Sequence, residues 1–165
     1  MEDNTKFNNL ITMQRVHWRN VVLELIDGQK RTHWCWYFLP NVPGLGKSPE
    51  SIRFAVTPKE FYFYMQNNEY AGNIFTVIHL IDQAYRRHPK MNLTEILANN
   101  PIDVLKWNSC LTLVRSMYIM GLIDVGDAMH SMILGSDHYG VCQHTVDVLK
   151  KFESSAIFME ISDAN

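Results

Sequence analysis

Residues 70–87 read YAGNIFTVIHLIDQAYRR, and their apolar side chains recur at intervals of three and four residues. That spacing gathers Ile74, Ile78 and Ile81 on one face of an α-helix. His88-Pro89 follows directly, and a proline cannot continue a helix. The stretch therefore predicts an amphipathic helix that ends at about Arg87.

The segments on both sides of this helix carry signals of the same kind. Thr57-Pro58-Lys59-Glu60 combines a capping residue, a proline at the first helical position and a glutamate that reaches back, so it predicts a helix to about Asn67. An apolar stripe over residues 5–27 predicts the first helix, and Gly28 supplies the left-handed residue that commonly ends one. The pattern further predicts short helical turns over 94–98 and longer helices over 103–121, 127–134 and 138–152.

The segment Gln29–Glu50 lacks this periodicity. It holds two tryptophans and several glycine or proline turn signals, which predict an ordered loop or a short extended segment. In an extended segment, Trp34 and Trp36 would face the same side because they are two residues apart. The alternative is that both tryptophans fill the core from the loop.

The chain as a whole predicts an all-α fold, since no strand-like alternation of useful length and no repeat is present. We expect one compact, single-domain multi-helical bundle with an ordered loop between the first and second helices. The domain is predicted over residues 1–153. The pattern then fades, which predicts a short, acidic and mobile tail over residues 154–165.

Composition limits the partners of the protein. Its 165 residues are 47% hydrophobic, enough for one core, and its formal net charge of -2 gives no general attraction to a nucleic acid polymer or an anionic membrane. No apolar run approaches the ~20 residues that span a bilayer. Cys35, Cys110 and Cys142 are widely separated, so we expect reduced thiols and a cytoplasmic location, in a bacterium or, for a viral gene, in its infected host cell.

The chemistry-bearing residues concentrate between Lys30 and Ser48. Cations, one imidazole and large aromatic faces meet there on a turn-rich segment, a combination that suits a planar anionic ligand such as a nucleotide. The stretch Gly44-x-Gly46-Lys47-Ser48 is similar to the end of a phosphate-binding loop, but the glycine spacing and the missing strand favour a plain glycine turn. His33 is either a general acid or base near neutral pH or a hydrogen-bonded structural residue. No metal-binding pattern is present, and we expect neither a metal nor a cofactor.

Two motifs resemble a known family. The first reads Gly28-x-Lys30-Arg31-x-His33-Trp34-x-Trp36, then Phe38-x-Pro40, then Gly44-Leu45-Gly46-x-Ser48, and the second reads Asp103-x-x-Lys106-x-x-Ser109-x-x-Thr112-Leu113. Together they resemble the bacterial domain-of-unknown-function family 1810, loosely labelled calpastatin-like, over most of residues 10–134. The chain departs from the family pattern at Asn41, Cys110 and Leu111.

The resemblance implies a compact multi-helical fold and little about activity. Calpastatin itself is a disordered inhibitor, whereas this chain has a core, so the label carries no function. The resemblance also implies that the two motifs form one site, with the helix that bears Lys106 lying against the loop that bears Lys30. The predicted ligand-binding residues are Lys30, Arg31, His33, Trp34, Trp36, Asn41, Lys47, Lys106, Ser109 and Thr112.

Three functions are open at this point. The first is non-catalytic binding of a phosphorylated nucleotide-type small molecule, either an ADP-ribose-like molecule or a cyclic nucleotide signal. The asparagine-rich, alanine-poor composition suits a phage protein that sequesters a host immune signal. The second is an enzyme that processes such a nucleotide with His33 as acid or base. The third is a protein-interaction domain, a homodimer whose seam is the aromatic run Phe61-Tyr62-Phe63-Tyr64.

Overall fold

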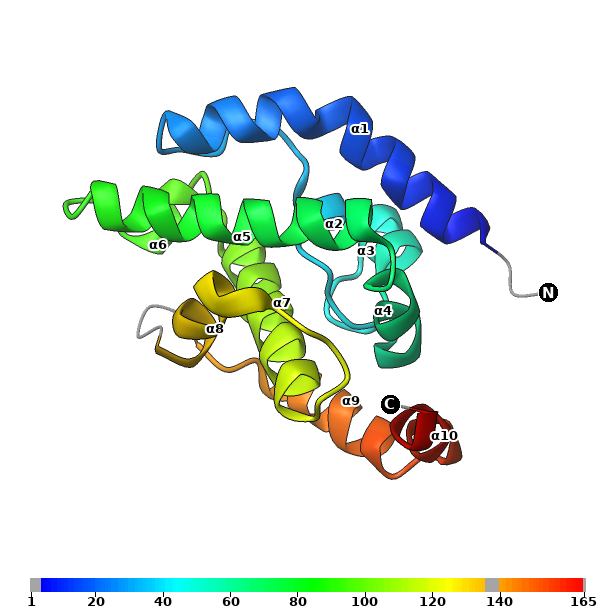
Figure 1. Ribbon diagram of the computed structural model, residues 1–165. Helices are drawn as coiled ribbons and strands as arrows, with labels where there is room; N and C mark the ends of the chain where they lie inside the picture. Colours follow the sequence, from blue (N-terminus) through cyan, green and yellow to red (C-terminus); the bar gives the residue numbers. More distant parts are fainter. Residues whose placement is uncertain (1–3, 136–139, 165) are drawn as a thin grey trace.

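The computed structural model describes residues 4–135 and 140–164 of the chain (Figure 1). These residues form ten α-helices and no strand, so the prediction of an all-α single domain is confirmed. The helices are α1 (Thr5–Ile26), α2 (Cys35–Phe38), α3 (Pro49–Phe54), α4 (Pro58–Tyr64), α5 (Asn68–Arg87), α6 (Leu93–Ile96), α7 (Pro101–Ile119), α8 (Gly126–Gly135), α9 (Gln143–Glu153) and α10 (Ala156–Ala164). Within the described residues, no helix is both long enough and apolar enough to cross a bilayer.

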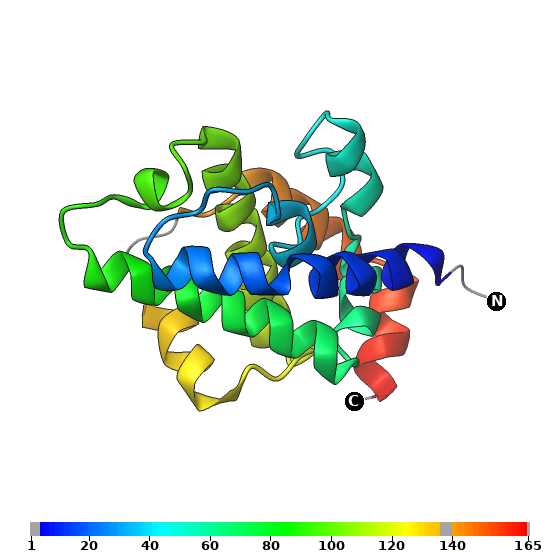
Figure 2. The same cartoon turned by 90° about the horizontal axis from the view of Figure 1, so that it is seen from above.

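Helices α1 and α5 lie side by side along one side of the molecule, as Figures 1 and 2 show. They run in the same direction, because Arg15 pairs with Glu69 near the start of α5 while Gly28 lies against His88 at its end. Gly28 has a φ of +93°, and a β-carbon at this position would lie 2.4 Å from the His88 imidazole. The glycine therefore permits both the end of α1 and the close approach to α5.

Helix α7 is the central element of the core. Trp107, Cys110, Leu113, Val114 and Met117 are all fully buried on it, which agrees with a helix that is apolar on most of its circumference. It starts at an Asn100 cap followed by Pro101, and it packs on α6, α8 and α9. The helices α6, α8 and α9 thus pack around one buried helix.

The capping signals in the sequence give the helix starts correctly. At α4 the Thr57 hydroxyl accepts from the Glu60 backbone N–H, and the Glu60 carboxylate accepts from the Thr57 backbone N–H at 2.8 Å. Asn92 and Glu95 form the same reciprocal arrangement at α6. Both caps are complete within four residues, which is why a sequence pattern predicts them.

The segment predicted as a loop, Gln29–Glu50, contains the short helix α2 and the first two residues of α3. Because α2 begins at Cys35, Trp34 and Trp36 do not share a side as they would in an extended segment. Trp34 is fully buried in the core, whereas Trp36 is half-buried. The extended arrangement of Trp34 and Trp36 is therefore absent; the alternative, that both fill the core from this segment, holds for Trp34, while Trp36 is partly buried and packs against the core.

The C-terminal part of the chain also differs from the prediction. The helix predicted over 138–152 begins at Gln143; residues 138–139 lie outside the described residues, and 140–142 are not helical. In place of a mobile tail over 154–165, the structure has α10, whose Phe158 ring packs edge-on against Phe152 at 5.6 Å. The buried side chain of Ile161 faces the same core. Phe158 and Ile161, three residues apart on α10, thus attach this segment to α9 and the core, and Asn165 lies outside the described residues.

The aromatic run in α4 is largely used for packing. Phe61 is fully buried, and the Tyr64 ring contacts those of Phe7 and Tyr70 at 4.8 and 5.7 Å. Only Phe63 is exposed among the four, at 44%, and the Lys59 ammonium lies 5.9 Å from its ring. The run therefore offers one exposed ring rather than a continuous seam.

Candidate functional site

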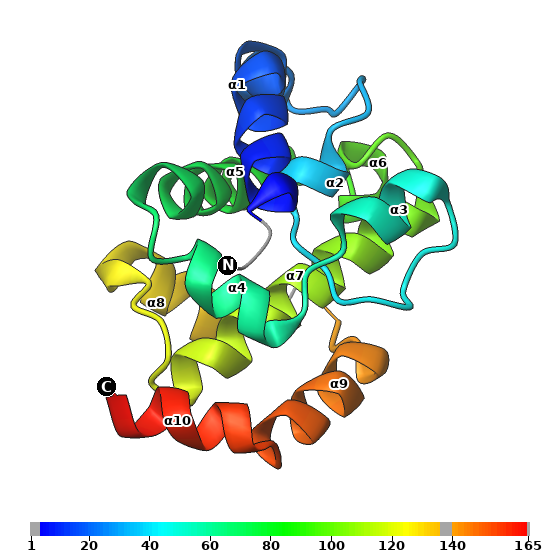
Figure 3. The ribbon, with the colours of Figure 1, turned by 90° about the vertical axis from the view of Figure 1, so that its right-hand side faces the viewer.

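A cavity of about 510 Å³ lies where three segments of the chain meet. The segments are the stretch before and within α2, the glycine turn with the start of α3, and the start of α7, which lie together on one side of the molecule (Figure 3). Its lining residues are Lys30, His33, Trp34, Cys35, Trp36, Leu45, Gly46, Lys47, Ser48, Ser51, Asn100, Ile102, Asp103, Leu105 and Lys106. Both sequence motifs contribute to this cavity.

Three of the charged lining residues, Lys30, Asp103 and Lys106, form a buried cluster. The Lys30 ammonium lies 2.8 Å from Asp103 Oδ2, and the Lys106 ammonium lies 3.4 Å from Asp103 Oδ1. Lys30 and Asp103 are each only 3% exposed, and Lys106 is 5% exposed. Two ammonium groups share one carboxylate, so the cluster has a net charge of +1 in a place where an unbalanced charge is costly.

Two indole rings adjoin these cations. Lys106 Nζ lies 4.5 Å from the Trp36 ring centroid, and Lys30 Nζ lies 5.7 Å from that of Trp34. Both distances are within the range of a cation–π interaction. The Trp36 indole N–H also donates to Ser51 Oγ at 3.3 Å, which fixes the orientation of the half-buried ring.

Glu24 of α1 holds the segment that carries Lys30 and Trp34. Its carboxylate accepts from the backbone N–H of Arg31 at 2.8 Å, from the Thr32 hydroxyl at 2.6 Å and from the Trp34 indole N–H at 2.9 Å. Burial alone would raise the pKa of Glu24, but these hydrogen bonds outweigh it and the pKa is lowered. A charged Glu24 therefore anchors one wall of the cavity without lining it.

The glycine turn is fixed by its neighbours. The Ser48 hydroxyl caps α3 by accepting from Ser51 N at 3.1 Å, so it serves the helix start. A β-carbon on Gly46 would lie 2.5 Å from Ser51 Oγ, and the Pro43 carbonyl hydrogen-bonds His144 Nε2 of α9 at 2.7 Å. The turn is thus a helix cap and cavity wall, which agrees with the interpretation of a plain glycine turn.

Six of the ten predicted ligand-binding residues line the cavity, namely Lys30, His33, Trp34, Trp36, Lys47 and Lys106. Arg31 does not, because it is exposed and its guanidinium pairs with Asp27. Asn41 is buried elsewhere and donates to the Leu39 carbonyl at 2.9 Å.

Ser109 and Thr112 lie on a different side of α7 from the cavity. The Ser109 hydroxyl bonds Thr145 Oγ1 at 2.7 Å, and Thr112 Oγ1 accepts from Cys142 N at 3.0 Å. Each step of three residues turns the side chain by about 60° around a helix, so by residue 112 the side chains face α9. The placement of these two residues in the cavity was wrong.

The sequence analysis missed Asp103 and Cys35 as members of the site. Asp103 was visible in the second motif, three residues before Lys106, a spacing that brings a carboxylate and an ammonium together on a helix. Burial, together with the nearby Asp103, raises the pKa of the Cys35 thiol well above its usual range. Cys35 is therefore held as a neutral thiol and is unsuited to nucleophilic attack.

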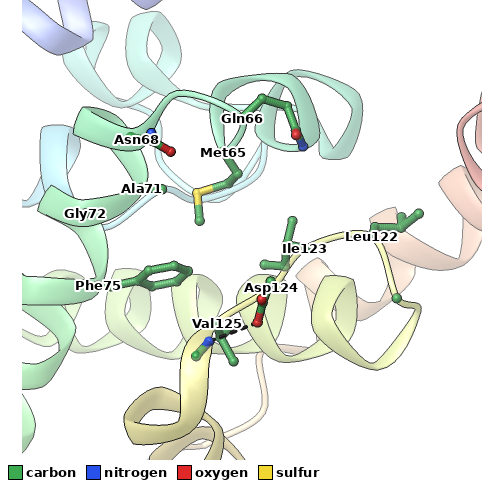
Figure 4. A pocket seen from close by; sticks show the side chains of 12 residues that line it. Met65, Gln66, Asn68, Ala71, Gly72, Phe75, Leu122, Ile123, Asp124 and Val125 are labelled. Carbon is green, nitrogen blue, oxygen red and sulfur yellow. Dashed lines mark hydrogen bonds between the residues drawn. The ribbon is translucent and has the colours of Figure 1, made fainter. Parts of the chain in front are cut away.

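A second cavity, of about 650 Å³, lies between the start of α5 and residues 121–126 (Figure 4). Figure 4 shows Met65, Phe75 and Ile123 around it. Its charged lining residue is Asp124, whose carboxylate accepts from the Gly126 backbone N–H at 3.0 Å. A negative lining does not suit an anion, so the Lys30–Lys106 cavity is the candidate site.

In the described part of the chain, no cluster of histidine, cysteine and acidic residues could hold a metal ion.

Comparison with known families identifies the chain. The model of the protein family described as "protein of unknown function (DUF1810)" matches residues 4–119. The chain belongs to the DUF1810 family. The match covers both motifs and stops at the end of α7, short of the residue 134 expected from the resemblance.

A solved structure supports the DUF1810 assignment. The conserved hypothetical protein Rv1873 from Mycobacterium tuberculosis is similar in fold, with a TM-score of 0.71 and 27% sequence identity. The similarity covers 88% of this DUF1810 chain and 97% of the mycobacterial one. No curated protein matches the chain. The comparisons thus give the DUF1810 protein its family and fold.

Proposed function

We propose that the protein binds a phosphorylated, nucleotide-type small molecule in the Lys30–Lys106 cavity without altering it. The observation that carries the proposal is the buried cluster of Lys30, Asp103 and Lys106, whose net charge of +1 lies open to a cavity of about 510 Å³. A bound anion would balance that charge. The volume lies within the roughly 300–1,000 Å³ typical of small-molecule sites.

The aromatic residues suit the remainder of a nucleotide. Trp36 is half-buried and lines the cavity next to the Lys106 ammonium, so a base could stack on the part of its ring that is accessible. Lys47 is exposed at the edge of the cavity and could approach a phosphate from the solvent side. Phosphate and base would then meet different walls of one cavity.

The test is a ligand screen in which every ligand is recovered. Thermal shift and calorimetry would be run against nucleotides, ADP-ribose derivatives and cyclic dinucleotides, followed by mass spectrometry of each ligand. Lys106→Met should weaken binding by about tenfold to a hundredfold, as expected for one lost hydrogen bond to a charged group. Lys150→Met, an exposed position on α9, is the matched control and should bind normally. Absence of binding across the screen would refute the proposal.

An enzyme is the second candidate because His33 is exposed at the cavity and its ring lies 6.1 Å from that of Trp36. The imidazole could exchange protons with a ligand stacked on the indole. In that case the ligand would be recovered changed, and His33→Ala would lose turnover while it kept binding. Recovery of unchanged ligand after long incubation would exclude this candidate.

Binding without turnover gives the protein a simple cellular effect, because it lowers the free concentration of its ligand. That effect is what a phage protein needs if it sequesters a nucleotide signal of host immunity. Reporter assays of such a signal, with wild-type protein and with Lys106→Met, would test this role. The variant should leave the signal active.

A further inference from the structure

The cavity has a charged inner end, here called the floor, which is formed by Lys30, Asp103 and Lys106. Its opening, here called the mouth, is apolar. Leu45, Ile102 and Leu105 line it, and Ile102 and Leu105 are 57% and 40% exposed. The exposure of these lining side chains places them at the opening, whereas Lys30, Asp103 and Lys106 lie buried at the other end. A ligand that fills the cavity would therefore put one anionic group at the floor and an apolar or aromatic body at the mouth.

The floor has room for one negative charge. Asp103 already balances one of the two ammonium groups, through its contacts at 2.8 and 3.4 Å. One further negative charge makes the buried cluster neutral. A second one would leave an excess negative charge in a desolvated place, and such a charge is costly.

Among the other charged or titratable groups at the cavity, the buried Cys35 thiol is neutral, and Glu24 does not line the cavity and is occupied by its hydrogen bonds to Arg31, Thr32 and Trp34. The remaining lining groups of this kind are exposed. Lys47 and His33 both face solvent at the edge, where water and salt screen their charge. They therefore contribute little to the balance at the floor. The buried cluster dominates the charge that a ligand meets inside.

We infer that the cavity selects a singly charged phosphodiester, such as the 3′,5′-cyclic phosphate of a nucleoside, over phosphomonoesters and diphosphates; the inference rests on the function proposed above. A phosphomonoester carries about -1.5 to -2 charges at pH 7. A diphosphate would in addition place its second phosphate against the apolar mouth formed by Ile102 and Leu105, where it lacks a partner. A cyclic phosphate presents one charge and leaves the base to cover the mouth.

The test uses matched pairs of nucleotides. The 3′,5′-cyclic and 5′-monophosphates of adenosine, guanosine, cytidine and uridine would be measured by calorimetry at pH 7.5 and pH 5.0. For the base that binds, the cyclic form should bind about tenfold tighter at pH 7.5. The preference should shrink at pH 5.0, because the second ionisation of a phosphomonoester has a pKa near 6 and is then reversed. A change in the charge of the protein between the two pH values acts on both members of a pair, so the ratio is the readout.

Substitution of the floor gives an independent check. Asp103→Asn raises the charge of the cluster to +2 and should shift the preference toward the monophosphate, whereas Lys150→Gln, at an exposed position on α9 outside the cavity, should leave it unchanged. Far-UV circular dichroism would show whether each variant folds; if Asp103→Asn does not, the pH comparison on the wild-type protein decides. Tighter binding of the monophosphate at pH 7.5, or a ratio that does not change with pH, overturns the inference and leaves the proposed function standing. Failure of all eight nucleotides to bind overturns the inference, whereas the proposed function falls only if no ligand of the wider screen binds.

Discussion

Replacement of Glu24 by glutamine should destabilise the protein strongly. The carboxylate of Glu24 is 6% exposed and accepts hydrogen bonds from Arg31 N, Thr32 Oγ1 and Trp34 Nε1, among others. Glutamine keeps one acceptor oxygen, brings two N–H donors to a place that supplies donors already, and has no charge. If two charge-assisted bonds are lost at about 1–2 kcal/mol each, the free energy of unfolding falls by about 2–4 kcal/mol at pH 7.

The contribution of Glu24 to the free energy of unfolding should depend on pH in a definite direction. Because the pKa of Glu24 is lowered in the folded state, its contribution is fully present above the usual glutamate pKa of about 4.3. The contribution is lost as the pH falls through the lowered pKa of the folded state. The gap in stability between wild type and Glu24→Gln should therefore be widest at neutral pH and should narrow in acid.

Urea denaturation at pH 7 and at several values down to pH 3 would measure the gap. Glu69→Gln is the matched control, since Glu69 is an exposed acceptor that pairs with Arg15 at 2.7 Å and should cost less than about 1 kcal/mol. If Glu24→Gln unfolds within about 0.5 kcal/mol of wild type at pH 7, the account of how α1 anchors the cavity wall is wrong.

Three further substitutions or treatments test other parts of the structure. Gly28→Ala should destabilise by about 2 kcal/mol or more, because it combines a φ of +93° with a β-carbon 2.4 Å from His88; His88→Ala in the same chain should recover part of the loss in thermal denaturation. The Cys35 thiol should resist a thiol reagent such as dithionitrobenzoate in the folded protein and react after unfolding, since burial raises its pKa; fast labelling of native Cys35, located by mass spectrometry, would contradict this. Phe63→Ser should leave the molecular mass in solution unchanged if the exposed ring is no dimer seam, and a dimer that dissociates on this change, seen by light scattering, would restore the homodimer hypothesis.

The helices with local signals were predictable. The Thr57–Glu60 cap and the stop at His88-Pro89 are each set by residues within a few positions of one another, and the structure has both. Helix α2 was missed because distant groups hold it: the Gln14 amide donates to the Tyr37 carbonyl at 2.8 Å, and Glu24 binds the Trp34 indole. A four-residue helix has too little periodicity for a sequence pattern.

The sequence analysis identified the two lysines of the site but not the carboxylate that pairs with them. Lys30 and Lys106 stand out in the two motifs, and the structure brings them to one cavity. The contact of Lys106 with Asp103 follows from their spacing of three residues, but the contact of Lys30 with Asp103 depends on the way α7 lies against the segment before α2, which no local spacing gives. Ser109 and Thr112 were placed wrongly because the sequence does not tell which side of α7 faces α9.

The hydrogen bond between His144 and Pro43 connects two parts of the chain that differ in their relation to the family model. The DUF1810 match ends at residue 119, so α9 lies in a part of the chain that the family model does not cover, whereas Pro43 lies within the match. The glycine turn that walls the cavity is thus braced by a residue outside the stretch that the family model matches. A relative with another side chain at this position could hold the turn differently while every cavity-lining residue stays the same. The shape of the cavity wall can then change through substitutions in the C-terminal region alone.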